Sequence, residues 1–133
     1  MAAMPAKSIS NVPIRVWIER ETDVFEPATI VEHEPNQDRV KATIESSNEV
    51  VVLERSIVYR RNKPWQIDTP DLTSLSYVNL PNIIHSLQQR YEAEKIYSLI
   101  SSVLVAVNPY RQLPIYNSES MLQYRTHPDG TVR

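Results

Sequence analysis

The amino-acid sequence predicts a mixed fold, with a small β domain first and then a helix and a β-hairpin of α/β type. Three observations support this prediction. Short segments with alternating apolar residues occupy residues 12–58, an apolar repeat of helical spacing begins at Leu80, and two apolar runs lie between Ile96 and Val107. Alternation marks a half-buried strand, whereas recurrence at three and four residues marks one face of a helix.

The first region contains four segments that we expect to be strands, at residues 12–18, 25–31, 40–44 and 50–53. Pro27 predicts a sheet edge or a bulge, because proline has no N–H to donate. The last segment does not alternate, so we expect it to be the most buried. Short strands joined by tight turns over about 50 residues predict a small barrel or sandwich, and an SH3-like barrel is the best match in size.

The segments between these elements are rich in polar residues and proline. Residues 1–11 are small and polar, and we expect them to be disordered. Polar turns are expected at Glu21–Asp23 and Glu34–Asp38. Residues 59–70 have few apolar positions and read as a linker, with Trp65 as its anchor to the surface.

The second region opens with the most regular helical pattern of the chain. Asn79 is a good cap for the helix start, and Pro81 is tolerated in the first turn because its missing N–H has no partner there. We expect the helix to bury one apolar face, formed by Leu80, Ile83, Ile84, Leu87 and Tyr91.

Two runs rich in β-branched residues follow the helix, and we expect them to pair as a hairpin. Runs without alternation indicate burial on both faces, yet too little chain follows Val107 to cover both. We therefore expect that a larger domain is missing, and that the hairpin has an unpaired edge through which the chain associates. Residues 118–124 predict a short helix.

The composition argues against several classes of protein. The net charge is −2, so no overall field favours nucleic acid or an anionic membrane. There is no cysteine for disulfides or thiolate metal sites. His33, His85 and His127 are too far apart to show ligand spacing for a metal. Since the longest apolar stretch is shorter than the roughly 20 residues that span a bilayer, we expect a cytoplasmic chain.

The chain has a single glycine, Gly130. Phosphate-cradling loops need several glycines, because their backbone N–H groups approach phosphate oxygens where a side chain would clash. Neither of the common glycine-rich nucleotide loops can be written with one glycine. We therefore expect no glycine-rich triphosphate-binding loop within these residues.

Residues 71–125 resemble the myosin head in several motifs that have the right order and spacing. Residues 71–81, D-L-T-S-L-S-Y-V-N-L-P, are similar to the family's D-[ML]-[TS]-x-L-[ST]-Y-[LV]-N-E-P. Residues 84–91 are similar to its helix ending in L-x-x-R-Y. Residues 105–116 resemble a strand leading into its purine-binding loop, which opens with N-P, here Asn108-Pro109, and closes with Y, here Tyr116. More weakly, residues 16–18, V-W-I, are similar to a strand of the SH3-like subdomain that many myosins carry.

The resemblance implies an SH3-like barrel followed by a helix and the edge hairpin of a P-loop-type motor domain. It divides the chain into a disordered N-terminus, the SH3-like subdomain, a linker and an incomplete motor domain, at residues 1–11, 12–58, 59–70 and 71–133. It implies the N-terminal fragment of an ATP-driven, actin-based motor that is associated with the cytoskeleton. The partners implied are the remainder of the myosin head and, through it, the actin filament.

The resemblance also implies a set of purine-binding residues. Asn108 and Tyr116 would hydrogen-bond the adenine edge, Pro109 would pack on the base, and Arg111 would lie nearby. The phosphate-binding loop, switch loops and actin-binding regions would lie beyond Arg133. ATP and Mg²⁺ are therefore expected for the parent motor, while this chain is expected to bind neither tightly and not to be an enzyme.

Two departures and one alternative accompany the resemblance. Leu80 replaces an acidic residue of the family, and Ser101 stands where the hairpin usually has glycine, so we expect an unusual turn. The alternative is a free-standing interaction module that binds peptides through exposed aromatic residues of the β domain. The candidates for that surface are Trp17, Phe25, Tyr59 and Trp65.

Overall fold

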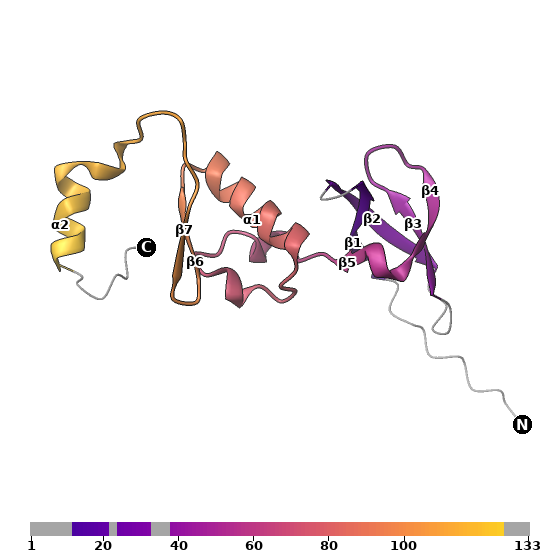
Figure 1. Ribbon diagram of the computed structural model, residues 1–133. Coiled ribbons are helices and arrows are strands. Elements are labelled where there is room, and N and C mark those ends of the chain that lie inside the picture. The colour runs from indigo at the N-terminus through magenta and orange to yellow at the C-terminus, as the bar shows by residue number, and fades with distance from the viewer. Residues whose placement is uncertain (1–11, 22–23, 33–37, 127–133) are drawn as a thin grey trace, which may run out of the picture.

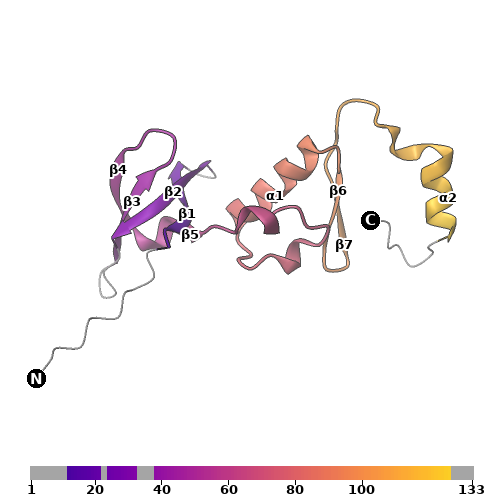
Figure 2. The same ribbon diagram turned by 180° about the vertical axis from the view of Figure 1, so that it is seen from behind.

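The computed structural model describes residues 12–21, 24–32 and 38–126. The expected disorder of residues 1–11 and most of the two expected polar turns lie outside these residues. A five-stranded sheet occupies one end of the molecule, helix α1 lies in the middle, and the β6–β7 hairpin lies on the other side of α1 (Figure 1). The same order is seen from behind in Figure 2. The predicted mixed, β-rich architecture with few helices is confirmed.

The sheet is antiparallel and has the order β4-β3-β2-β1-β5. Its strands are β1 Ile14–Glu21, β2 Val24–Glu32, β3 Arg39–Ile44, β4 Val50–Glu54 and β5 Val58–Arg60. The core comes from residues whose alternation the sequence shows, namely Val16, Ile18, Ala28, Ala42 and Ile44. Among the described strands β4 and β5 are edges that do not pair with each other, so the predicted closed SH3-like barrel is not confirmed.

Pro27 lies inside the sheet rather than at its edge, which corrects the prediction for β2. It is paired with Trp17 of β1, and its carbonyl accepts a hydrogen bond of 2.9 Å from the Glu45 amide just past the end of β3. In an antiparallel strand the N and O atoms of one residue face the same neighbour. The missing N–H therefore faces β3, and the β2–β3 ladder ends at the next pair, Ala28 and Ile44.

Strand β4 alternates in burial, although its apolar run predicts burial on both faces. Val51 and Leu53 pack against the core, while Val50 and Val52 are exposed. The strand is an edge with only one covered face. A run of valines here reflects strand propensity and not two-sided burial.

The second region contains α1 Leu80–Glu92, β6 Tyr97–Ile100, β7 Val103–Ala106 and α2 Ser118–Thr126. The predicted helix start is confirmed, because the Asn79 side chain accepts a hydrogen bond of 3.1 Å from the Asn82 amide. The predicted hairpin is confirmed as well, and Ser101 in its turn has a φ of 57°, a left-handed value that favours glycine. Both hairpin faces are expected to be buried, but Val103 and Leu104 are exposed.

The most buried polar side chains of α1 form one face, which corrects the predicted apolar face in part, since Ile83, Leu87 and Tyr91 of that face are half-buried. Asn82, Ser86 and Arg90 are buried and recur every four residues. In contrast, Leu80 is 49% exposed and Ile84 is 43% exposed. The polar side chains are buried because the segment packed against them is irregular and its backbone carbonyls need hydrogen-bond donors. Ser86, for example, donates a 2.8 Å hydrogen bond to the Ile67 carbonyl.

Trp17 joins the sheet to α1. It is only 7% exposed, and its Nε1 donates a 2.9 Å hydrogen bond to Asn82 Oδ1. The ring of His85 meets it edge-on at 5.0 Å between centroids, and the Arg61 guanidinium lies 4.6 Å from its centroid. Trp65, the expected anchor, is 75% exposed. The anchoring tryptophan therefore comes from β1 and not from the segment between the two regions.

Candidate functional site

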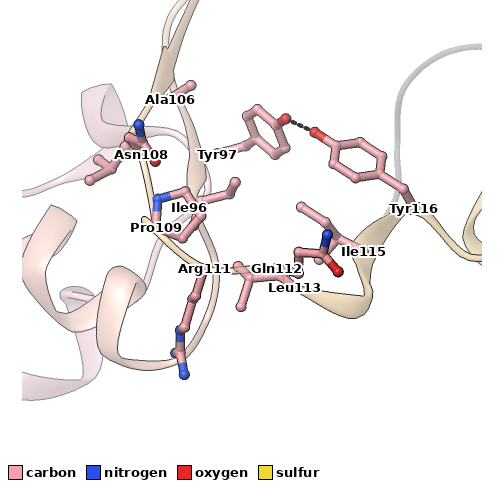
Figure 3. Close-up of a pocket in the computed structure, with 11 residues that line it drawn as sticks. Ile96, Tyr97, Ala106, Asn108, Pro109, Arg111, Gln112, Leu113, Ile115 and Tyr116 are labelled. Atoms are coloured by element: carbon pink, nitrogen blue, oxygen red, sulfur yellow. Dashed lines mark hydrogen bonds between the residues drawn. The ribbon is translucent and has the colours of Figure 1, made fainter.

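A cavity of about 630 Å³ lies where the β6–β7 hairpin runs into the loop that follows it (Figure 3). This volume is in the range of small-molecule sites, about 300–1,000 Å³. All four residues of the predicted purine site line it: Asn108, Pro109, Arg111 and Tyr116. The rest of the lining is mostly apolar, and consists of Ile96, Tyr97, Ala106, Val107, Gln112, Leu113 and Ile115.

Local sequence explains why the hairpin and the loop form the walls of this cavity. The Val107 amide donates a 3.0 Å hydrogen bond to the Ile96 carbonyl, which closes the base of the hairpin. The loop then carries prolines at 109 and 114, and Pro114 starts a single helical turn, Pro114–Tyr116. Because proline restricts φ, the path of the loop is limited before any ligand arrives.

Asn108 holds the first turn of the loop. Its Oδ1 accepts a 2.9 Å hydrogen bond from the Tyr110 amide, and Tyr110 has a left-handed φ of 52°. Asparagine side chains commonly stabilise such turns. Within the described residues the Asn108 amide nitrogen makes no hydrogen bond, so it can donate to a ligand in the cavity.

Two tyrosines meet at one side of the cavity. The hydroxyls of Tyr97 and Tyr116 are hydrogen-bonded to each other, as the dashed line in Figure 3 shows. Tyr97 is on β6, in register with Ala106 of β7, whereas Tyr116 ends the helical turn of the loop. Sequence reasoning missed Tyr97 as a lining residue. A signal in the sequence could have found it: Tyr97 begins β6, and β6 pairs with β7, the strand that leads into the loop.

Arg111 has a different orientation from the other three predicted residues. Its guanidinium pairs with Glu94 at 3.0 Å, just beyond the end of α1. In Figure 3 this side chain points away from the Tyr97–Tyr116 pair. Both members of the ion pair are largely exposed, so the pair itself adds little stability.

Two acidic side chains of the segment before α1, Asp68 and Asp71, are stabilised in their charged form. The Lys95 ammonium and the Arg90 guanidinium next to Asp68 hold the pKa of its carboxyl below its ordinary value. Hydrogen bonds from the Thr73 hydroxyl and amide lower the pKa of Asp71.

Over the described part of the chain, no three acidic, histidine or cysteine side chains cluster as metal ligands would. No helix there is long and apolar enough to cross a membrane.

The cavity combines an amide donor, a proline ring, a phenol pair and an aliphatic lining. Such groups can hold a flat heteroaromatic ring, because the apolar surfaces cover its faces and the polar groups meet its edge. The described residues around it include no glycine-rich loop that could cradle a phosphate chain.

Comparisons with known proteins identify the family. Residues 69–132 match the model of the myosin head (motor domain). Myosin-8 of Arabidopsis thaliana is 34% identical over 111 residues, which is 83% of this chain and 7% of that protein. Myosin-J heavy chain of Dictyostelium discoideum is 34% identical over 118 residues, 88% of this chain and 5% of that protein. Unconventional myosin-VI of Sus scrofa is 30% identical over 118 residues, 88% of this chain and 9% of that protein.

The aligned stretches are longer than residues 69–132, so they also take in much of the five-stranded sheet. The similarity therefore spans both regions, and it does not favour a free-standing interaction module. The chain covers less than a tenth of the length of these relatives. This chain belongs to the myosin family and corresponds to the N-terminal part of a myosin motor head.

Proposed function

We propose that this chain supplies the purine-binding loop of an ATP-driven, actin-based motor. Asn108 donates from its amide nitrogen to the adenine edge, and Tyr116 bonds the same edge through its hydroxyl. Pro109 packs on the base, while Arg111, held by Glu94, ties the loop to α1. The observation that supports this proposal is that these four residues line one cavity whose size suits a small ligand.

The other parts of the nucleotide are bound elsewhere in the motor. ATP and Mg²⁺ are the cofactors of the complete motor, and most of a nucleotide's binding energy comes through its phosphates and its metal ion. The remainder of the head covers the exposed apolar residues of the hairpin, such as Val103 and Leu104, and carries the actin contacts.

For the 133-residue chain alone we expect no measurable ATPase and a nucleotide Kd no better than millimolar. Magnesium-dependent ATP binding in the micromolar range would contradict this.

Substitution of Asn108 by aspartate tests the purine contact. Asn108→Asp keeps the oxygen that accepts from the Tyr110 amide but replaces the amide donor with a second acceptor. Asn117→Asp is the matched control: it adds the same charge outside the cavity lining and keeps the 2.8 Å hydrogen bond from the Ser120 amide. Binding is measured by saturation-transfer NMR of adenosine, with cytidine as the reference ligand.

The wild-type chain and Asn117→Asp should both show a stronger transfer signal from adenosine than from cytidine. Asn108→Asp should lose that preference, because a carboxylate oxygen facing a purine ring nitrogen is repelled and has no proton to share. An equal response to the two nucleosides in the wild-type chain would refute the proposed site. An unchanged preference in Asn108→Asp would remove Asn108 from it.

A further inference from the structure

The last turn of α1 contacts both walls of the cavity through two consecutive residues. Arg90 reaches the hairpin wall: its Nε donates to Ser98 Oγ at 2.8 Å, and its Nη2 donates to the Tyr97 carbonyl at 2.8 Å. Tyr91 reaches the loop wall, where its hydroxyl donates a 3.2 Å hydrogen bond to the Pro109 carbonyl. Tyr97 and Pro109 both line the cavity.

Arg90 is held so that it can fix the position of the hairpin. Arg90 is only 7% exposed, and its guanidinium forms an ion pair with Asp68, with 2.9 Å between Nη1 and Oδ1. The planar guanidinium thus joins three segments in one fixed geometry, which an ammonium group cannot do. A well-packed apolar side chain would stabilise the fold about as well as a buried charge. The specific contribution of Arg90 is therefore the placement of Tyr97 and Ser98.

We propose that Arg90 and Tyr91 are positioning residues of the purine pocket, each holding one wall at the spacing that the base requires. The proposal rests on the function proposed above. Among the described residues, the hydroxyls of Tyr97 and Tyr116 join the hairpin wall to the loop wall. Without the helix contacts the loop samples more conformations, and the binding energy must then order it. Preorganisation of this kind raises affinity without adding a contact to the ligand.

Tyr91→Phe in the full 133-residue chain is the mildest test, because it removes only the hydroxyl that holds Pro109. Tyr59→Phe is the matched control: it also removes one tyrosine hydroxyl, with its 3.1 Å bond to Glu19, but on the sheet away from the cavity. Arg90→Lys is the stronger variant, since a lysine can still pair with Asp68 but loses the fork that reaches β6. Each variant is titrated with adenosine by saturation-transfer NMR, and free-chain amide exchange is followed by mass spectrometry.

We expect Tyr91→Phe to weaken adenosine binding about five-fold, the effect of one hydrogen bond, and Arg90→Lys to weaken it more. Amide exchange should become faster in residues 108–116 for Tyr91→Phe and in 97–100 for Arg90→Lys. Tyr59→Phe should change neither quantity. A merely structural role would speed exchange throughout the chain and lower the unfolding midpoint without this local pattern.

The outcomes separate this inference from the proposed function. If the wild-type chain binds adenosine and Tyr91→Phe binds it equally well, the positioning role is refuted while the purine site stands. If the wild-type chain does not prefer adenosine, the purine site fails. In that case unchanged exchange of residues 108–116 in Tyr91→Phe would refute the positioning role too, and locally faster exchange would support it for the loop itself.

Discussion

Asn82→Ala should be among the most destabilising single substitutions in this chain, because Asn82 is the centre of the contact between the sheet and α1. The residue is 3% exposed. Its Oδ1 accepts from Trp17 Nε1 at 2.9 Å and from the Asn62 amide at 3.3 Å. Its Nδ2 donates to the carbonyls of Arg60 and Tyr77, at 2.8 and 2.9 Å.

The magnitude follows from which groups lose their last partner. The Arg60 carbonyl keeps a 3.0 Å hydrogen bond from Asn79, and the Tyr77 carbonyl keeps one of 3.0 Å from Asn62. The indole N–H of Trp17 and the amide of Asn62 lose the only acceptor described for each. A buried donor left without an acceptor costs about 1–3 kcal/mol, so the variant should lose about 2–6 kcal/mol of its free energy of unfolding.

The free energy of unfolding is measured by urea titration at low protein concentration in a Trp65→Phe background. The tryptophan emission, excited at a wavelength that tyrosine does not absorb, then reports on Trp17 alone. Asn82→Ala should lower the urea midpoint and shift the native emission of Trp17 to the red, since water reaches the indole. Gln88→Ala, an exposed position on the same helix, should change the free energy by less than about 0.5 kcal/mol. A loss below about 1 kcal/mol for Asn82→Ala, with unchanged emission, would refute the reasoning.

Three further predictions concern the hairpin turn, the half-buried His85 and the hairpin edge. Ser101→Gly should raise the free energy of unfolding by about 1 kcal/mol, measured as a higher urea midpoint, because the φ of 57° favours glycine. An unchanged midpoint would mean that serine adopts this φ without strain. Burial, followed by the charge of Arg61, lowers the pKa of His85 from its ordinary 6.5, so the unfolded chain binds more protons below that value. Stability should therefore fall as pH drops through 6.5 and below, and less so in His85→Phe; equal pH profiles from urea titrations would contradict this. Leu104→Lys, at an exposed position of β7, should reduce self-association in sedimentation velocity, while a wild-type chain that is already monomeric would remove the basis for this prediction.

Periodicity and turn chemistry predict most of the elements from the sequence. The alternation of Val40, Ala42 and Ile44 marks a strand with one buried face, and β3 has that burial pattern. Asn79 and Pro81 mark the start of a helix, and α1 begins at Leu80. These predictions succeed because the signals are local: the spacing of apolar residues and the preferences of caps depend on neighbours in the chain.

The candidate site was predicted in part. Asn108, Pro109, Arg111 and Tyr116 come from one continuous loop motif, so a sequence resemblance could name them together. Tyr97 could not be named in that way, because its place in the cavity depends on the pairing of β6 with β7. The direction of the Arg111 side chain cannot be predicted from the loop motif either, since it depends on an ion pair with Glu94, just beyond α1.

The sequence by itself determined most of the strands and the helices, which residues form the loop, and which family the chain resembles. Only the tertiary structure decided which face of α1 is buried, that Trp17 and not Trp65 joins the two regions, and which groups support the cavity. The physical reason is that hydropathy predicts the burial of apolar side chains, whereas Asn82 and Arg90 are buried by hydrogen bonds to partners distant in the chain. Whether a polar group can be buried depends on which donors and acceptors surround it, and folding alone brings those together.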